Sequence, residues 1–62
     1  MSSSEIIEHV GISTTSYSDA VQNAIKAIQQ KNKVHWFEVL EQRGRITADG
    51  NIEYQVIVRL GL

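Results

Sequence analysis

Apolar and polar residues alternate along three stretches of this chain, and a fourth stretch repeats apolar residues at helical spacing. The clearest alternation is Ile52–Leu60, where every second residue is apolar, which predicts a β-strand with one buried face. Val34–Gln42 predicts another strand, with Phe37 and Val39 on one face. Glu5–Ile12 is rich in β-branched residues and predicts one more strand, which comes first in the chain. The pattern does not decide which of its faces is buried, because apolar residues occur at both odd and even positions.

The helical stretch lies between the first two strands, from Asp19 to about Lys31. Ser16, three residues before Asp19, matches a capping pattern in which its hydroxyl accepts a hydrogen bond from an amide of the first turn. The apolar residues form one stripe and are mostly small, so the helix can lie close to the surface that it covers. They are Ala20, Val21, Ala24, Ile25, Ala27 and Ile28.

Two short segments predict changes of direction. Arg43-Gly44-Arg45 predicts a bend after the second strand, and Asp49-Gly50-Asn51 predicts a tight hairpin turn before the third. With the third strand between the other two, all neighbouring strands are antiparallel. The sequence thus predicts an α+β fold of order β-α-β-β, a three-stranded antiparallel sheet with one helix packed on one face. Residues 1–62 form a single domain, with 1–4 frayed.

The two faces of this sheet differ in what they carry. We expect the helix to cover the face that carries Phe37, Val39, Tyr54, Val56 and Val58. The opposite face carries Trp36, Glu38, Leu40, Gln55, Ile57 and Arg59. A domain of 62 residues buries only about 60% of its unfolded surface. An outward tryptophan and isoleucine on such a domain predict a large symmetric homo-oligomer that covers them.

Composition narrows the classes of function. There is no cysteine, and two histidines are too few for a closed structural zinc site, so association is the remaining means of stabilisation. A net charge of -1 provides no basic stripe and argues against a nucleic-acid partner. No apolar run is long enough to span a bilayer, and the first residues lack the features of a signal peptide, so we expect a cytoplasmic protein without a membrane partner.

Trp36 and Gln55 are the strongest candidate site residues. The indole of Trp36 can stack on a flat ligand, or it can pack into a subunit contact, which is the commoner role of such a residue. Gln55 carries both a donor and an acceptor, so it can read the edge of a ring held by Trp36, or it can simply be solvated. The residues alone leave both alternatives open.

The charged residues favour no catalytic site. Arg43 and Arg45 can pair with a phosphate or form salt bridges with glutamates, and the second role is favoured. The candidate glutamates are Glu38, Glu41 and Glu53. Glu38 and Glu53 share a face, but a three-stranded sheet offers no cleft for acid–base chemistry. No metal-ligand spacing and no nucleophile–base pair are visible, so we expect no metal site and no enzyme.

Several short segments, in order along nearly the whole chain, resemble the dodecin family. They are His9-Val10-Gly11-Ile12-Ser13, Ser18-Asp19-Ala20-Val21, Trp36-Phe37-Glu38-Val39, Arg43-Gly44, Tyr54-Gln55-Val56 and Leu60-Gly61-Leu62. The chain departs from the family pattern at His35 and in the polar start of its first strand, and it ends at Leu62 without the short tail of many members.

The resemblance implies a function and a site. Dodecins assemble as hollow dodecamers and hold flavins between subunits, stacked on a tryptophan that Trp36 matches. Gln55 matches the glutamine that hydrogen-bonds the edge of the flavin ring. Arg43 matches an arginine that lies beside the phosphate-bearing side of the flavin. A cation at the variable position of Arg45 favours flavin mononucleotide (FMN) over riboflavin. Some bacterial members also bind coenzyme A, for which the resemblance designates no residue here.

The resemblance therefore predicts a non-enzymatic protein that stores flavin and quenches its photochemistry. The alternative that the residues leave open is a structural or interaction module, whose exposed sheet face only mediates oligomerisation. Flavin-dependent catalysis is disfavoured, because a ring stacked between indoles leaves little access for a substrate.

Overall fold

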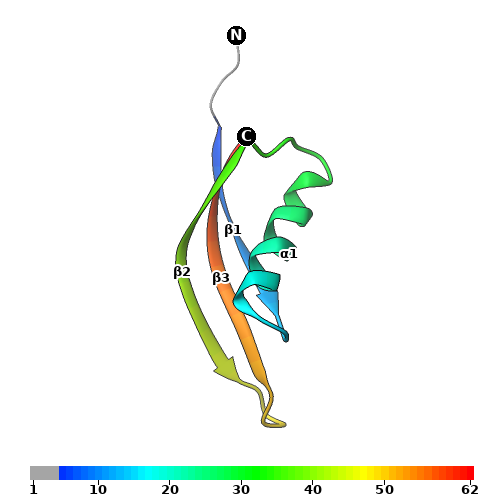
Figure 1. Ribbon diagram of the computed structural model, residues 1–62, viewed down its shortest axis with the longest axis vertical. Helices are drawn as coiled ribbons and strands as arrows, with labels where there is room; N and C mark the ends of the chain where they lie inside the picture. The colour runs from blue at the N-terminus through cyan, green and yellow to red at the C-terminus, as the bar shows by residue number, and fades with distance from the viewer. Residues whose placement is uncertain (1–4) are drawn as a thin grey trace.

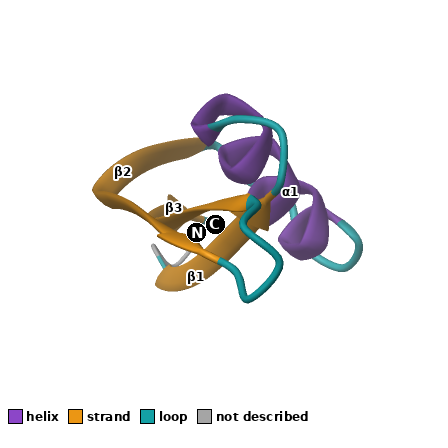
Figure 2. Cartoon of the chain, turned by 90° about the horizontal axis from the view of Figure 1, so that it is seen from below, coloured by secondary structure: helices purple, strands orange, loops and turns teal. Residues whose placement is uncertain are grey.

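The computed structural model describes residues 5–62 and has the predicted order of elements. They are β1 (Ile6–Ser13), α1 (Tyr17–Gln29), β2 (Trp36–Ile46) and β3 (Ile52–Gly61), as Figure 1 shows. The strands form one antiparallel sheet in the order β1-β3-β2, and the helix lies on one side of it (Figure 2). The predicted fold is confirmed.

The expected fraying of residues 1–4 concerns a segment outside the described residues. No helix within residues 5–62 is long and apolar enough to cross a membrane.

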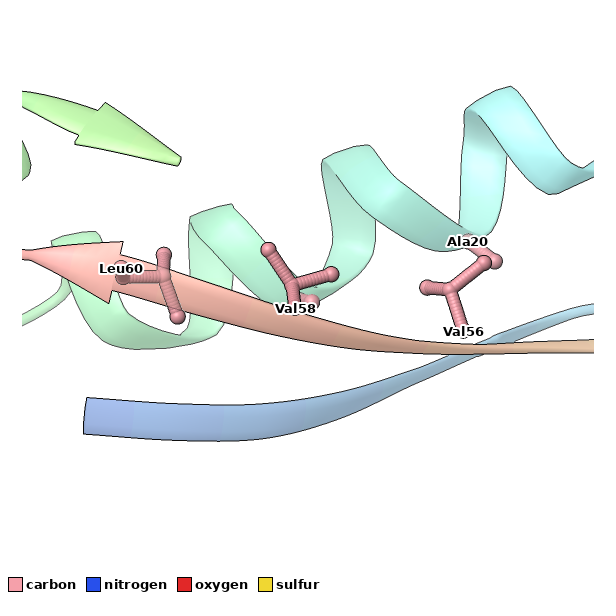
Figure 3. Packing of buried hydrophobic residues seen from close by; sticks show 5 residues of the cluster. Ala20, Val56, Val58 and Leu60 are labelled. Carbon is pink, nitrogen blue, oxygen red and sulfur yellow. The ribbon is translucent and has the colours of Figure 1, made fainter. Parts of the chain in front are cut away.

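The core lies between α1 and the central strand β3. Every second residue of β3 points toward the helix, and Val56, Val58 and Leu60 are almost completely buried there (Figure 3). Ala20 and Ala24 of the helix are also buried, as predicted for the small-residue stripe, whereas Ala27 of the same stripe is exposed. Because the five buried side chains are small or medium in size, the core of one protomer is thin.

Close contact between α1 and β1 depends on Gly11. A Cβ atom added at Gly11 would overlap the backbone carbonyl oxygen of Ala20 and come within 2.8 Å of the Cβ of Ala24. The helix therefore rests directly on the backbone of β1 at this point. Any side chain at Gly11 would push the helix away from the sheet.

Hydroxyl and carboxylate groups fasten the start of α1 to the end of β1. The hydroxyl of Ser16 accepts a hydrogen bond from the backbone N–H of Asp19 at 3.0 Å, which confirms the predicted cap. The buried hydroxyl of Ser13 donates to Asp19 at 2.7 Å, and Asn23 donates to the carbonyl of Ile12 at 2.9 Å. These bonds set where the helix begins relative to the sheet.

Strand β2 is longer than predicted and follows a different course. The sequence placed a bend at Arg43-Gly44-Arg45, and this is wrong, because these residues pair with β3 as far as Ile46. The register shifts between Val39 and Glu41, so Leu40 has no partner of its own and forms a β-bulge. Beyond the bulge the alternation is reversed, which turns Arg43 and Arg45 to the sheet face away from the helix.

The hairpin between β2 and β3 closes as the sequence predicts. Gly50 has a φ angle of +87°, a conformation that glycine adopts without strain. Its N–H donates to the carbonyl of Thr47 at 2.9 Å, and the N–H of Thr47 donates to the carbonyl of Asn51 at 2.8 Å. The tip of this hairpin projects past the helix in Figure 1.

The helix covers less of the sheet than the sequence suggested. It packs mainly against β1 and β3, so the outer strand β2 receives little cover. Phe37 lies on the helix side of the sheet, because its partner is the buried Leu60, yet it is 50% exposed. The expectation that the helix covers Phe37 is therefore wrong, since the residue lies beyond the edge of the helix.

Strand β1 turns its more apolar side away from the helix. Ile7, His9, Gly11 and Ser13 face α1, whereas Ile6, Val10 and Ile12 lie on the opposite face and are about half exposed. The sequence left this choice open because both parities contain apolar residues. The observed choice leaves three large aliphatic side chains without cover from their own protomer, which is typical of an association surface.

We predict that Gly11→Ala destabilises the protein by about 1–3 kcal/mol, because the added methyl group forces α1 away from β1. Urea unfolding at fixed protein concentration measures the loss. Gln22→Ala, at an exposed position of the same helix, is the control and should change stability by about 0.5 kcal/mol or less. Equal midpoints for Gly11→Ala and the unmodified chain would contradict the close contact.

Candidate functional site

The sheet face opposite α1, called the bare face below, carries the candidate site residues. Residues that pair directly across strands share a face, so the register defines it. Because Val56, Val58 and Leu60 point to the helix, the alternate residues of β3 and their partners point away from it. The bare face consists of Ile6, Glu8, Val10, Ile12, Trp36, Glu38, Glu41, Arg43, Arg45, Glu53, Gln55, Ile57, Arg59 and Gly61.

Trp36 lies at one end of the bare face, above Gly61. The two residues are paired across β2 and β3, and a Cβ atom added at Gly61 would overlap the Nε1, Cε2 and Cδ1 atoms of the indole. The five-membered part of the indole therefore occupies the space that any other residue at this position would fill. Trp36 remains 46% exposed, so its side chain is not in the interior of its own protomer.

Gln55, Arg43, Arg45 and Glu53 form a polar cluster toward the other end of the bare face. Arg43 is directly opposite Gln55, and Arg45 is directly opposite Glu53. Arg45 Nε donates to Glu53 Oε1 at 2.6 Å, and Gln55 Nε2 donates to the same oxygen at 3.0 Å. The bulge at Leu40 makes this cluster possible, since without it both arginines would face the helix side.

The charges within the cluster are unevenly paired. Arg45 and Gln55 both donate hydrogen bonds to Glu53. These bonds hold the pKa of the Glu53 carboxyl below its ordinary value, and the bond from Arg45 has the larger effect. Glu53 is thus ionised at neutral pH and neutralises much of the charge of Arg45. Arg43 is bound more loosely, with 3.7 Å between its Nη1 and Glu41 Oε2, and 63% of its side chain is exposed. Arg43 is therefore the more available cation for an anionic ligand.

A second charged row crosses the middle of the bare face. Arg59 lies between Glu8 of β1 and Glu38 of β2, and its Nη1 approaches Glu38 Oε1 at 3.4 Å. Glu38 is thus engaged in a salt bridge, and Glu53 in the cluster described above. The two carboxylates therefore occupy separate rows of the sheet.

The structure does not bring Trp36 and Gln55 together within one protomer. The partner of Trp36 on β3 is Gly61, six positions from Gln55. At the rise of an extended strand this corresponds to about 20 Å, more than the length of a three-ring flavin. The two side chains therefore share a face without being neighbours, and the idea that Gln55 reads the edge of a ring held by Trp36 stays a prediction. Of the four predicted site residues, Gln55, Arg43 and Arg45 are neighbours and Trp36 is apart.

Sequence analysis missed one residue that shapes this face and part of the role of another. Gly61 provides the flat surface under the indole, and its role follows only from the register that pairs it with Trp36. The sequence named Glu53 as a possible salt-bridge partner of the arginines, which the structure confirms for Arg45, but its contact with Gln55 was missed. Its spacing of two residues from Gln55 on a strand was a usable signal, because residues at that spacing lie side by side on one face.

Comparisons with known proteins identify the family. The family model described as Dodecin matches residues 4–62. The crystal structure of a mutant dodecin of Thermus thermophilus is 34% identical, with a TM-score of 0.87, and the match covers 97% of this chain and 90% of that chain. The dodecin of Streptomyces coelicolor is also 34% identical, with a TM-score of 0.87, and the match covers 97% of this chain and 87% of that chain.

A third structure is similar in fold alone. It is the calcium dodecin of Mycobacterium tuberculosis, described with a novel calcium-binding site, at 22% identity and a TM-score of 0.90. The match covers 98% of this chain and 89% of that chain. No curated protein sequence matches the chain. The match of the family model over almost the whole length, together with relatives above 30% identity, shows that this chain belongs to the dodecin family.

Proposed function

We propose that this chain is a non-enzymatic protein that binds flavin at subunit interfaces of a dodecamer, stores it and quenches its photochemistry. The observation that carries the proposal is the exposed indole of Trp36, which rests on Gly61 at the edge of an otherwise uncovered sheet face. An indole that rests on the strand with one part of its surface can stack on a planar heteroaromatic ring with its exposed surface. A nearby indole can also donate an electron to an excited flavin, which quenches its fluorescence.

The distance between the two halves of the site argues for contributions from two protomers. The backbones at Trp36 and Gln55 are about 20 Å apart along the sheet, which favours a flavin that takes its tryptophan and its glutamine from different chains. The bare face also exposes Ile6, Val10 and Ile12, which need cover. Closing protomers over this face would bury the aliphatic side chains and bring a tryptophan of one chain toward the polar cluster of another.

The polar cluster supports FMN as a ligand, with riboflavin as the related possibility. Gln55 is half-buried and offers hydrogen-bond groups to the edge of a flavin ring. Arg43 is exposed and loosely paired, and it can approach a phosphate with two parallel N–H groups. Arg45 adds positive charge beside it, although Glu53 offsets much of that charge. We assign no residue to coenzyme A.

The first prediction from the proposed function concerns stacking on Trp36. Adding FMN to the apo protein at micromolar concentration should quench flavin fluorescence strongly, and Trp36→Ala should abolish the effect because the stacking partner is gone. Trp36→Phe should retain part of the binding but quench weakly, since phenylalanine is a poor electron donor. His35→Ala, at the exposed position just before the indole, is the control and should behave like the unmodified chain. Unchanged flavin emission with the unmodified chain would refute flavin binding.

The second prediction concerns Gln55. Gln55→Ala should weaken FMN binding by roughly 1–3 kcal/mol, because a buried ring edge loses its hydrogen-bond partner. A fluorescence titration gives the dissociation constant. Gln42→Ala is the control, because this exposed glutamine lies on the helix side of β2, opposite Val56. An affinity for the Gln55 variant equal to that of the unmodified chain would remove Gln55 from the site.

The third prediction concerns assembly. Sedimentation should give a mass close to twelve times the 7.0 kDa of one chain. Val10→Asp should lower this mass, since it places an unpaired charge among the aliphatic residues of the bare face. Ala48→Asp, in the exposed hairpin turn, adds the same charge and should leave the mass unchanged. A stable monomer of the unmodified chain would contradict the proposal.

A further inference from the structure

We propose that Glu53 determines which edge of a ligand Gln55 reads, by holding the side-chain amide of Gln55 in one orientation. This inference deepens the proposed function and rests on it. Glu53 and Gln55 are two residues apart on β3 and share the bare face, and Arg45 lies directly opposite Glu53 on β2. The three side chains meet at one oxygen atom, Glu53 Oε1.

The chemistry of a carboxylate fixes the direction of the amide. Gln55 Nε2 lies 3.0 Å from Glu53 Oε1. An ionised carboxylate only accepts hydrogen bonds, so the amide nitrogen must face it and the carbonyl oxygen must point elsewhere. Gln55 is then left with its carbonyl oxygen as an acceptor and one N–H as a donor. These two groups, in a fixed order, are what it presents to a ligand.

Arg45 in turn holds Glu53. Its Nε donates to Glu53 Oε1 at 2.6 Å, a short charge-assisted hydrogen bond. The side chain of Glu53 is only 19% exposed, whereas that of Arg45 is 63% exposed. The carboxylate is thus anchored between the two strands and cannot rotate freely away from Gln55. Arg45 acts on the ligand partly through Glu53 and Gln55, in addition to any direct contact with a phosphate.

The order of donor and acceptor matters for a stacked ring. The pyrimidine part of a flavin carries an N–H between two carbonyl groups, so an adjacent acceptor and donor can pair with the N–H and one carbonyl. If the amide of Gln55 turned over, it would pair with the other carbonyl only after the ring slid sideways. A ring stacked on an indole resists that movement, because sliding reduces the overlap. Glu53 is therefore a positioning residue that selects one placement of the ring.

A double-mutant cycle with lumiflavin tests this role. Lumiflavin has the flavin ring but neither the ribityl chain nor the phosphate, so phosphate contacts of the arginines do not enter. Glu53→Gln should weaken its binding by about 3- to 10-fold, because an amide at that position can either donate or accept and no longer fixes Gln55. Gln55→Ala should weaken it by about 10-fold or more. The double variant should bind no more weakly than Gln55→Ala alone.

Asp49→Asn is the matched control. It also removes one carboxylate near the hairpin, but Asp49 contacts Thr47 and Asn51 instead of Gln55. Its affinity for lumiflavin should stay within about twofold of that of the unmodified chain. Sedimentation verifies that each variant assembles, and Glu53→Asp, whose shorter arm cannot hold both partners, replaces Glu53→Gln if the latter changes the mass.

Two results would overturn the inference while flavin binding stands. One is an unchanged affinity of Glu53→Gln for lumiflavin. The other is a double variant whose loss equals the product of the two single losses, because independent effects would mean that Glu53 does not act through Gln55. Failure of the unmodified chain to bind both FMN and lumiflavin would instead overturn the proposed function, and this inference with it.

Discussion

A single helix of 13 residues covers only one side of the sheet, and there mainly two of the three strands. The rest of the structure depends on this shortage of cover. The thin core around Val56, Val58 and Leu60 leaves Ile6, Val10 and Ile12 outside on the bare face and Phe37 beyond the helix. A chain of this size cannot hide these side chains itself, so the bare face has the character of an association surface.

One irregularity decides the composition of the candidate site. The bulge at Leu40 reverses the alternation of β2. Trp36 and Arg43 are seven residues apart, an odd number that would place them on opposite faces of a regular strand, yet they share the bare face. Arg43 and Arg45 thereby come opposite Gln55 and Glu53. The same strand carries the indole of Trp36 at one end and the two arginines at the other, with the bulge between them.

The sequence predicted the fold well because the strand and helix periods are clear in the segments that form the core. Val56, Val58 and Leu60 alternate without interruption, and Ala20 and Ala24 lie on one helical stripe. Prediction from the sequence failed where the position of a residue depends on its pairing with another strand. The register explains the bulge in β2 and the contact of Trp36 with Gly61, and the length of the helix explains the exposure of Phe37. The local pattern of apolar and polar residues contains information on neither.

Sequence reasoning also grouped Trp36 with Gln55, because both lie on the same face of the sheet. A shared face does not imply contact, since residues on it can be separated by the whole length of a strand. In the proposed arrangement this separation has a thermodynamic consequence. A ligand that needs groups from two chains binds only the assembled form, so its binding energy adds to the stability of the assembly by mass action. Stored flavin would then reinforce the assembly that stores it.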